Sequence, residues 1–99
     1  MFIHSVYFWL AEDLSDAQRA QFVEQAGALT TIETVRHGWL GKPADTDRPV
    51  IDRSYSYALT VAFDDEAAHD VYQDHPVHDR FRDDCGSFWT KVLIYDSVA

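Results

Sequence analysis

Two histidines flank a proline in the stretch YQDHPVHDRF, and a tyrosine precedes the first histidine by three residues. These three side chains are Tyr72, His75 and His78. Imidazole and phenol groups at this spacing could bind a metal ion, transfer protons in catalysis, or simply cap and fill a junction between two helices. The rest of the chain has to decide between these three interpretations.

His78 has the best position for proton transfer. Pro76 suits the first position of a helix, which makes His78 the third residue of that helix. His78, Phe81 and Cys85 are spaced i, i+3 and i+7, so we expect this stripe to face inward. Burial and the positive end of the helix dipole both favour a neutral imidazole, which is a suitable base for removing a proton beside a carbonyl. The alternative is that His75 and His78 only cap and fill the junction, with His75 nearer to solvent.

Three further side chains are candidates for the same chemistry: His4, Tyr57 and Tyr72. His4 shares one face of a strand with apolar residues, so its imidazole would be buried and neutral if that face meets the helices. The alternative is a core histidine that makes one hydrogen bond. Tyr57 and Tyr72 also fit a simple packing role, Tyr57 as a half-buried aromatic and Tyr72 on the inner face of a helix.

A metal site in this region is a weaker interpretation. His75 and His78 could share one side of the chain with Glu66, His69 and Asp79 nearby in sequence. However, the proline between the two histidines interrupts the helix, and no cysteine or carboxylate follows at the spacing of a closed zinc site. We expect neither a structural metal nor a cofactor, although exposed carboxylates could bind Mg²⁺ loosely.

The single cysteine and two arginines of the longest loop have less defined roles. Cys85 follows Asp83 and Asp84, whose charges raise the pKa of a thiol, so a role in the core is favoured over a nucleophile. Arg48 and Arg53 are placed to meet either an acidic ligand or a partner subunit, and the sequence does not choose between them.

Composition limits the classes of partner. The net charge is −9 with one cysteine in 99 residues, of which 46% are hydrophobic. Such an acidic protein would be repelled by nucleic acid and by anionic membrane surfaces. No apolar run of membrane-spanning length and no signal-peptide pattern occur. We therefore expect one domain over residues 1–99, soluble and cytoplasmic.

The pattern of apolar residues predicts the elements that hold these side chains. Alternating or continuous apolar and aromatic runs indicate strands, whereas capping signals and helical periodicity indicate helices. Ser15 and Gln18 form a capping box at the start of the first helix. The predicted strands cover residues 2–9, 33–41, 55–63 and 88–96, and the predicted helices 15–30, 64–72 and 76–85.

This order predicts an α+β fold of the split ferredoxin-like type, β-α-β-β-α-β, with a four-stranded antiparallel sheet. The helices can cover only one face of the sheet. The other face carries Tyr7 and Trp9, and it would form a large exposed apolar patch in a monomer. We therefore expect a homodimer that packs sheet against sheet on this side, with the sheets about 10 Å apart.

The chain resembles the stress-responsive A/B barrel (Dabb) domain family, whose members are dimeric ferredoxin-like α/β barrels. The resemblance covers residues 2–96. It rests on His4 in the first strand and on SYALTVAFDD, YQDHPVHDRF and FWTKVLIYD in this order and spacing. It implies the fold and the dimer more directly than an activity.

Some plant members of the family are polyketide cyclases that carry out an aldol-type ring closure without a cofactor. The resemblance implies that His4, Tyr72 and His78 occupy the matching positions of their histidine and tyrosine residues. Two positions differ from the cyclase pattern: Tyr57 stands in place of a histidine, and Ala26 in place of a tyrosine.

Two classes of function remain open. The first is a cofactor-independent cyclase or lyase that acts on an aromatic or polyketide-like molecule through His4, Tyr57, Tyr72 and His78. The second is a non-catalytic homodimer that binds an apolar small molecule or contributes to stress tolerance. An open pocket of a few hundred Å³ between sheet and helices that reaches His78 would favour ligand chemistry.

Overall fold

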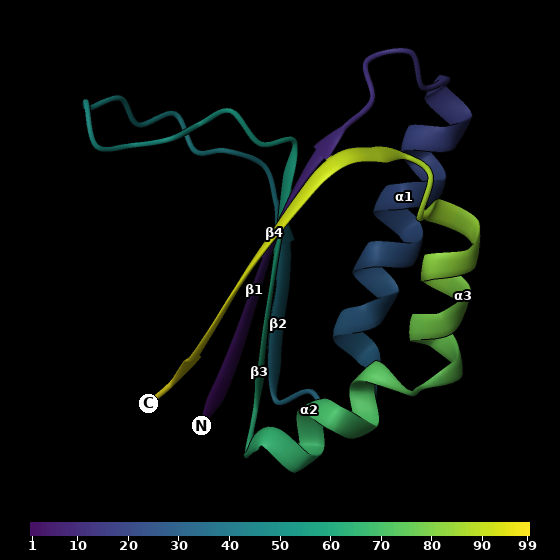
Figure 1. The fold of residues 1–99 in the computed structure, drawn as a ribbon, viewed down its shortest axis with the longest axis vertical. Coiled ribbons are helices and arrows are strands. Elements are labelled where there is room, and N and C mark those ends of the chain that lie inside the picture. Colours follow the sequence, from purple (N-terminus) through teal and green to yellow (C-terminus); the bar gives the residue numbers. More distant parts are fainter.

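The structure, a computed structural model, describes residues 1–99. Its elements follow the order strand, helix, strand, strand, two helices, strand (Figure 1). The strands are β1 (Phe2–Leu10), β2 (His37–Gly41), β3 (Tyr57–Phe63) and β4 (Trp89–Val98). The helices are α1 (Asp16–Ala28), α2 (Glu66–Gln73) and α3 (Pro76–Cys85), and a 3₁₀ turn (Leu29–Thr31) follows α1. The predicted ferredoxin-like plan is confirmed.

The four strands form one antiparallel sheet in the order β2-β3-β1-β4. All three helices lie on the same side of it (Figure 1). Burial alternates along β1. His4 and the apolar residues on the same face of the strand are buried, whereas Tyr7 and Trp9 on the other face are only partly buried. The predicted assignment of the two faces of this strand is therefore confirmed.

Each helix begins at a side chain that caps it. The Ser15 hydroxyl accepts a hydrogen bond from the Gln18 amide at 3.1 Å, and the Gln18 side chain accepts one from the Ser15 amide at 2.9 Å. The Asp65 carboxylate caps α2. The His75 imidazole caps α3 just before Pro76. These polar contacts satisfy amide groups that have no partner within the helix.

Two local predictions were wrong. The second strand begins at His37 rather than at Glu33, because the preceding residues form a turn in which the Val35 amide donates to the Ile32 carbonyl at 2.9 Å. Helical spacing predicts that Val23 shares a buried face of the first helix with Phe22 and Ala26, but Val23 is 38% exposed and only the other two are buried in α1.

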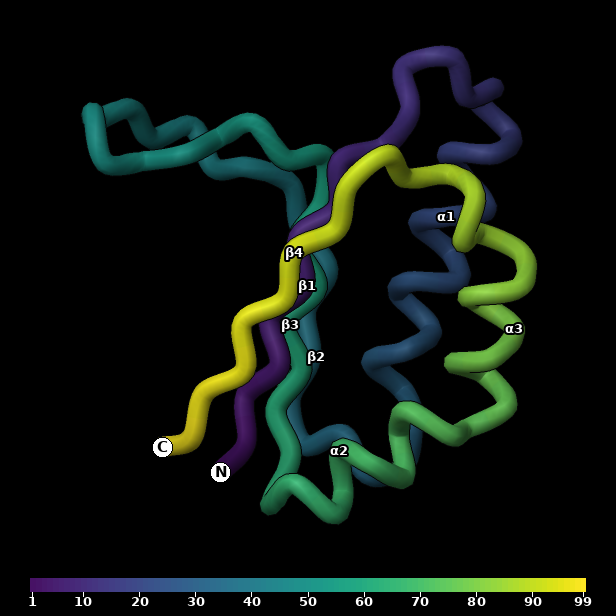
Figure 2. The backbone as a smooth tube through the Cα atoms, viewed as in Figure 1, coloured from purple at the N-terminus to yellow at the C-terminus, as the bar shows by residue number.

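The core fills the space between the sheet and the helices, where 15 buried residues form one cluster. None of the helices has both the length and the apolar character needed to cross a membrane. The chain between β2 and β3 projects from the sheet on the side away from the helices (Figures 1 and 2). Met1 and Ala99 lie together, joined by backbone hydrogen bonds of 2.8 and 2.9 Å.

Candidate functional site

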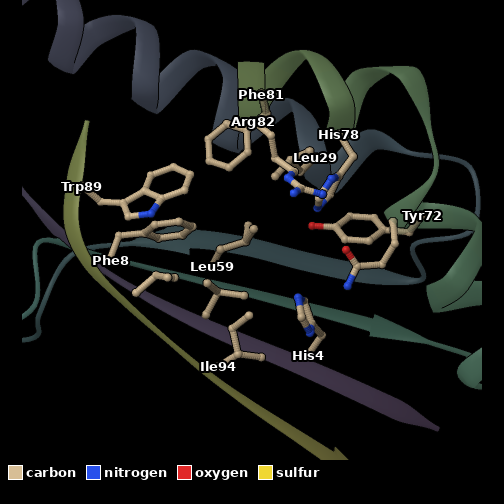
Figure 3. A pocket seen from close by; sticks show the side chains of 13 residues that line it. His4, Phe8, Leu29, Leu59, Tyr72, His78, Phe81, Arg82, Trp89 and Ile94 are labelled. Atoms are coloured by element: carbon tan, nitrogen blue, oxygen red, sulfur yellow. The ribbon is translucent and has the colours of Figure 1, made fainter. Parts of the chain in front are cut away.

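A cavity of about 300 Å³ opens between the sheet and the helices (Figure 3). Thirteen residues line it, and nine of them are hydrophobic. Three of the four predicted site residues, His4, Tyr72 and His78, are among them. They come from β1, α2 and α3, so the fold brings together groups that are far apart in sequence.

His78 lies in the first turn of α3 and is half-buried. Its ring stands edge-on to the Tyr72 ring, with 5.1 Å between the centroids. Its Nδ1 is buried and has no hydrogen-bond partner in the protein. Burial lowers the pKa of His78, and the nearby Arg82 guanidinium lowers it further. The imidazole is therefore held in its neutral form, as the sequence predicted.

Tyr72 is 1% exposed, and its hydroxyl points into the cavity (Figure 3). Burial raises the pKa of this phenol well above its usual range. The hydroxyl therefore keeps its proton at neutral pH. In that state it can donate a hydrogen bond to an oxygen of a bound molecule.

His4 is paired with a carboxylate. It stands directly opposite Asp96 in the β1–β4 register, and its Nδ1 lies 2.5 Å from Asp96 Oδ1. The His4 side chain is 5% exposed. A carboxylate at this distance fixes the ring orientation and stabilises a proton on Nδ1, which directs the other ring nitrogen to act as acceptor.

Tyr57 is not among the residues that line the cavity. Its ring packs on Phe22, with centroids 5.5 Å apart, and the Lys42 Nζ lies 5.9 Å from the ring centre. The packing role considered for Tyr57 accounts for these contacts. A catalytic role for Tyr57 stays a prediction.

His75 belongs to the helix junction. Its Nδ1 accepts a hydrogen bond from the Val77 amide at 3.1 Å, and its Nε2 lies 3.1 Å from a Glu33 carboxylate oxygen. The two histidines of YQDHPVHDRF therefore occupy different environments. One caps the helix, and the other lines the cavity.

Cys85 and the loop arginines lie outside the cavity lining. Cys85 is fully buried, and burial, with Asp84 nearby, raises the pKa of its thiol to about 11. A thiol of this kind is a poor nucleophile at neutral pH. In the loop between β2 and β3, Arg53 lies 3.4 Å from Asp45.

Of the residues considered for a metal site from the sequence, only His69 belongs to the group whose donor atoms are best arranged for a metal ion. This group consists of three potential metal-ligating atoms that lie within 4.8 Å of one another, one each from His4, His69 and Asp96. Two imidazoles and one carboxylate suit zinc and other divalent transition metals. However, the hydrogen bond between His4 and Asp96 already satisfies two of these donors. His69 Nε2 also contacts the Gln73 side chain at 3.1 Å.

Sequence reasoning missed Asp96, which pairs with His4 but does not line the cavity, and several of the lining residues. Asp96 could be assigned only once the strand register placed it opposite His4. Gln73 and Trp89 line the cavity through the packing of α2 and the start of β4. Arg82 also lines it and follows His78 by four residues, a spacing that places both on one helical face and was visible in the sequence.

Comparisons with known proteins agree with this architecture. The family model of the Stress responsive A/B Barrel Domain matches residues 2–99. Olivetolic acid cyclase from Cannabis sativa is 26% identical over 94 residues, which cover 94% of this chain and 91% of the cyclase.

Two solved structures share the fold. A dimeric ferredoxin-like protein of unknown function from Thermobifida fusca is 18% identical with a TM-score of 0.79, covering 99% of this chain and 90% of that protein. The hydroxynitrile lyase from Passiflora edulis is 19% identical with a TM-score of 0.80, covering 99% of this chain and 92% of that protein. With the family model spanning nearly every residue, the chain belongs to the stress-responsive A/B barrel (Dabb) domain family.

Proposed function

We propose that this protein is a cofactor-independent enzyme of the cyclase or lyase type that removes a proton beside a carbonyl of a small, largely apolar molecule. One observation carries the proposal: His4, Tyr72 and His78 line the same cavity, whose other walls are mainly hydrophobic. The similarity to olivetolic acid cyclase supports the reaction class.

His78 is the proposed base. Its neutral nitrogen takes the proton from the carbon beside the carbonyl, and the electron pair moves onto the carbonyl oxygen. The Tyr72 hydroxyl donates a hydrogen bond to this developing oxyanion. The enolate then attacks a second carbonyl to close a ring, or expels a leaving group in a lyase reaction. His78 returns its proton to the product oxygen or to the leaving group, so the base is regenerated.

His4 has a supporting role in this scheme. The Asp96 carboxylate holds its ring at 2.5 Å and keeps the second nitrogen available on the cavity side of the sheet. That nitrogen can orient a substrate oxygen or relay the proton after the first step.

Proton exchange tests the reaction class without knowledge of the natural substrate. A panel of aromatic and aliphatic 1,3-diketones is incubated with the protein in D₂O, and NMR follows deuterium incorporation at the carbon between the carbonyls. We expect His78→Gln to lower the protein-dependent exchange by about 10²- to 10⁴-fold, the usual contribution of a general base. Tyr72→Phe should lower it by about 10²-fold because a hydrogen-bond donor to the oxyanion is lost.

The exposed His37→Gln variant is the matched control and should leave exchange unchanged. Tyr57→Phe decides the open question about that residue, since a loss as large as that of Tyr72→Phe would place it in the catalytic machinery. Exchange that survives in His78→Gln would contradict the proposed base.

The second candidate is a binding protein without turnover. It is favoured by the hydrogen bond that already occupies His4 and by the apolar lining of the cavity. Saturable binding of the same diketones, with no exchange above that of solvent in wild-type protein, would support this candidate and contradict the enzyme.

We further propose that the active form is a homodimer joined through the open face of the sheet. A hollow on this face is lined by five hydrophobic residues and one carboxylate: Tyr7, Trp9, Tyr55, Leu93, Tyr95 and Asp52. Tyr95 is 61% exposed. Surfaces of this character are typical of interfaces between subunits. The similar Thermobifida fusca protein is described as dimeric, which supports the assignment.

A further inference from the structure

The charges around the cavity differ from those of the rest of the protein. The chain carries 17 acidic residues and has a net charge of −9, yet no Asp or Glu lines the cavity. Arg82 is the one Lys or Arg side chain among the lining residues. The wall of this largely apolar cavity therefore carries a cation and no carboxylate, although the protein as a whole is acidic.

Arg82 stands at the mouth of this cavity. It is exposed, as are Val92 and Ile94 on the β4 side of the lining, whereas Leu29 and Leu59 at the inner wall are buried. Figure 3 shows the guanidinium beside His78, near the Tyr72 hydroxyl. An arginine in this position meets the end of a molecule that enters from solvent.

The guanidinium of Arg82 has no carboxylate within ion-pair distance. Three other arginines of the protein have such a partner: Arg36 lies 2.8 Å from Asp64, Arg53 lies 3.4 Å from Asp45, and Arg80 lies 3.5 Å from Asp84. Asp79 and Asp83 adjoin Arg82 on the same helix, but neither forms an ion pair with it. Its hydrogen-bond donors are therefore free to bind a ligand.

We infer that the ligand of this cavity is an amphiphilic acid, whose carboxylate binds the Arg82 guanidinium at the mouth while its apolar body lies against Phe8, Leu29 and Leu59. This rests on the proposed function, since it concerns the same cavity. A guanidinium offers two parallel N–H donors that match the two oxygens of a carboxylate. The arrangement also sets an orientation, because the charged end is held beside His78 and the adjoining carbons lie between His78 and Tyr72.

Long-range electrostatics cannot supply a preference for acids in this protein. A net charge of −9 repels anions in general, so an acid that binds better than its neutral analogue must do so through a local contact. Arg82 is the one cationic group of the lining that can make this contact.

A matched pair of probes tests this inference. A chain-length series of ω-phenylalkanoates and the corresponding primary amides is titrated into the wild-type protein by isothermal titration calorimetry. NMR of the Leu29 and Leu59 methyl groups verifies that binding occurs in the cavity. We expect each acid to bind about two- to fivefold more tightly than its amide, as suits an ion pair at an exposed arginine.

Variants on α3 assign the preference to one side chain. Arg82→Gln should abolish the acid preference and leave amide binding unchanged, and Arg82→Lys should retain part of it. Arg80→Gln is the control, because this arginine is on the same helix but does not line the cavity. It should bind both probes as the wild type does.

The outcomes separate this inference from the proposed function. Acid and amide binding equally well to the wild type would overturn the inference, as would an acid preference that survives in Arg82→Gln. In both cases the amide still occupies the cavity, so the proposed function is unaffected. If no probe of either series moves the cavity methyl resonances, both the cavity as a ligand site and the inference are contradicted.

Discussion

The two faces of the sheet use the same strands for different purposes. On the helix-covered face, β1 presents His4 beside apolar neighbours, and the adjoining cavity collects Tyr72 and His78. On the open face, the same strand presents Tyr7 and Trp9. Both faces are largely apolar, but only the covered one holds imidazoles away from water.

This difference shows how burial separates the roles of similar side chains. Tyr72 is enclosed on the covered face, and its phenol pKa is raised by burial. Tyr95 on the open face remains 61% exposed, and its ring lies 6.3 Å from that of Tyr7. A buried tyrosine with a retained proton is suited to donate a hydrogen bond in catalysis, whereas an exposed aromatic cluster is suited to pack against a partner.

The largest effect is expected from a charge on the open face. Tyr7→Asp should place an unpaired carboxylate in the proposed dimer interface and cost about 3–5 kcal/mol, enough to give monomers or unfolded protein. Size-exclusion chromatography with light scattering measures the change. Val50→Asp introduces the same charge in the loop, at a side chain that is 83% exposed, and should remain dimeric. A soluble, folded dimer of Tyr7→Asp would show that this face is not the interface.

A smaller effect is expected from added volume on the covered face. A Cβ built on Gly38 of β2 would lie 2.8 Å from the Thr30 Cβ and 3.2 Å from a Val61 methyl group. Gly38→Ala should therefore lower the free energy of unfolding by about 1–3 kcal/mol, the usual cost of overpacking. In the same strand a Cβ on Gly41 meets nothing within 4 Å, so Gly41→Ala is the control. Urea unfolding compares the two, and equal stabilities would show that the covered face is loosely packed at β2.

The sequence predicted the fold well because its signals are local. Alternation along β1, the Ser15 capping box and Pro76 at the start of α3 depend on neighbours in the chain, and each appears as expected. The start of β2 was missed because the segment from Ile32 to Val35 forms a turn instead of extending the strand. Nothing in its β-branched composition indicated that turn.

The candidate site was only partly predictable. The positions of His4, Tyr72 and His78 followed from which face of each element is buried. The placement of Asp96 opposite His4 depends on the β1–β4 register, which the sequence does not specify. Tyr57 was placed with the site because it stands where the cyclase pattern of the family has a histidine, but its position near one end of β3 puts it against Phe22 and outside the cavity lining.

Acid should destabilise the protein through the covered face. Burial lowers the pKa of both His69 and His78; for His69 the nearby His4 adds to this while Asp96 and Asp70 oppose it. Below about pH 6.5 the unfolded chain therefore binds more protons than the folded one. The free energy of unfolding falls as the pH drops from about 6.5 toward the lowered pKa values of these two histidines in the folded state. This loss should be smaller than that of Gly38→Ala.

Thermal unfolding between pH 7.5 and 5 measures this loss. The window lies above the range in which most carboxylates titrate. His69→Gln combined with His78→Gln should flatten the dependence, whereas His37→Gln, at an exposed histidine of β2, should preserve it. A wild-type stability that rises on acidification would contradict the burial of neutral imidazoles on this face.

The smallest effect is expected in the titration midpoint of His78 when the charge of Arg82, at the cavity mouth, is removed. NMR titration of the five histidines in the wild type should give His78 a midpoint below the free value of about 6.5. Burial and Arg82 disfavour the protonated imidazole of His78, and on α3 only Asp79 favours it. The imidazoles of His4 and His69, when protonated, act on His78 in the same direction as Arg82. Arg82→Gln removes one of these positive charges, so the His78 midpoint should rise by a fraction of a pH unit, and Arg82→Lys should keep most of the lowering. Arg80→Gln should leave the His78 midpoint unchanged.

A carboxylate bound at Arg82 should shift the His78 midpoint in the same direction as removal of the Arg82 charge. An acid ligand would therefore raise the basicity of His78 when the substrate is bound. A His78 midpoint at or above 6.5 in the wild type would exclude it as the neutral base, and a midpoint unmoved by Arg82→Gln would show that the guanidinium does not act on the imidazole.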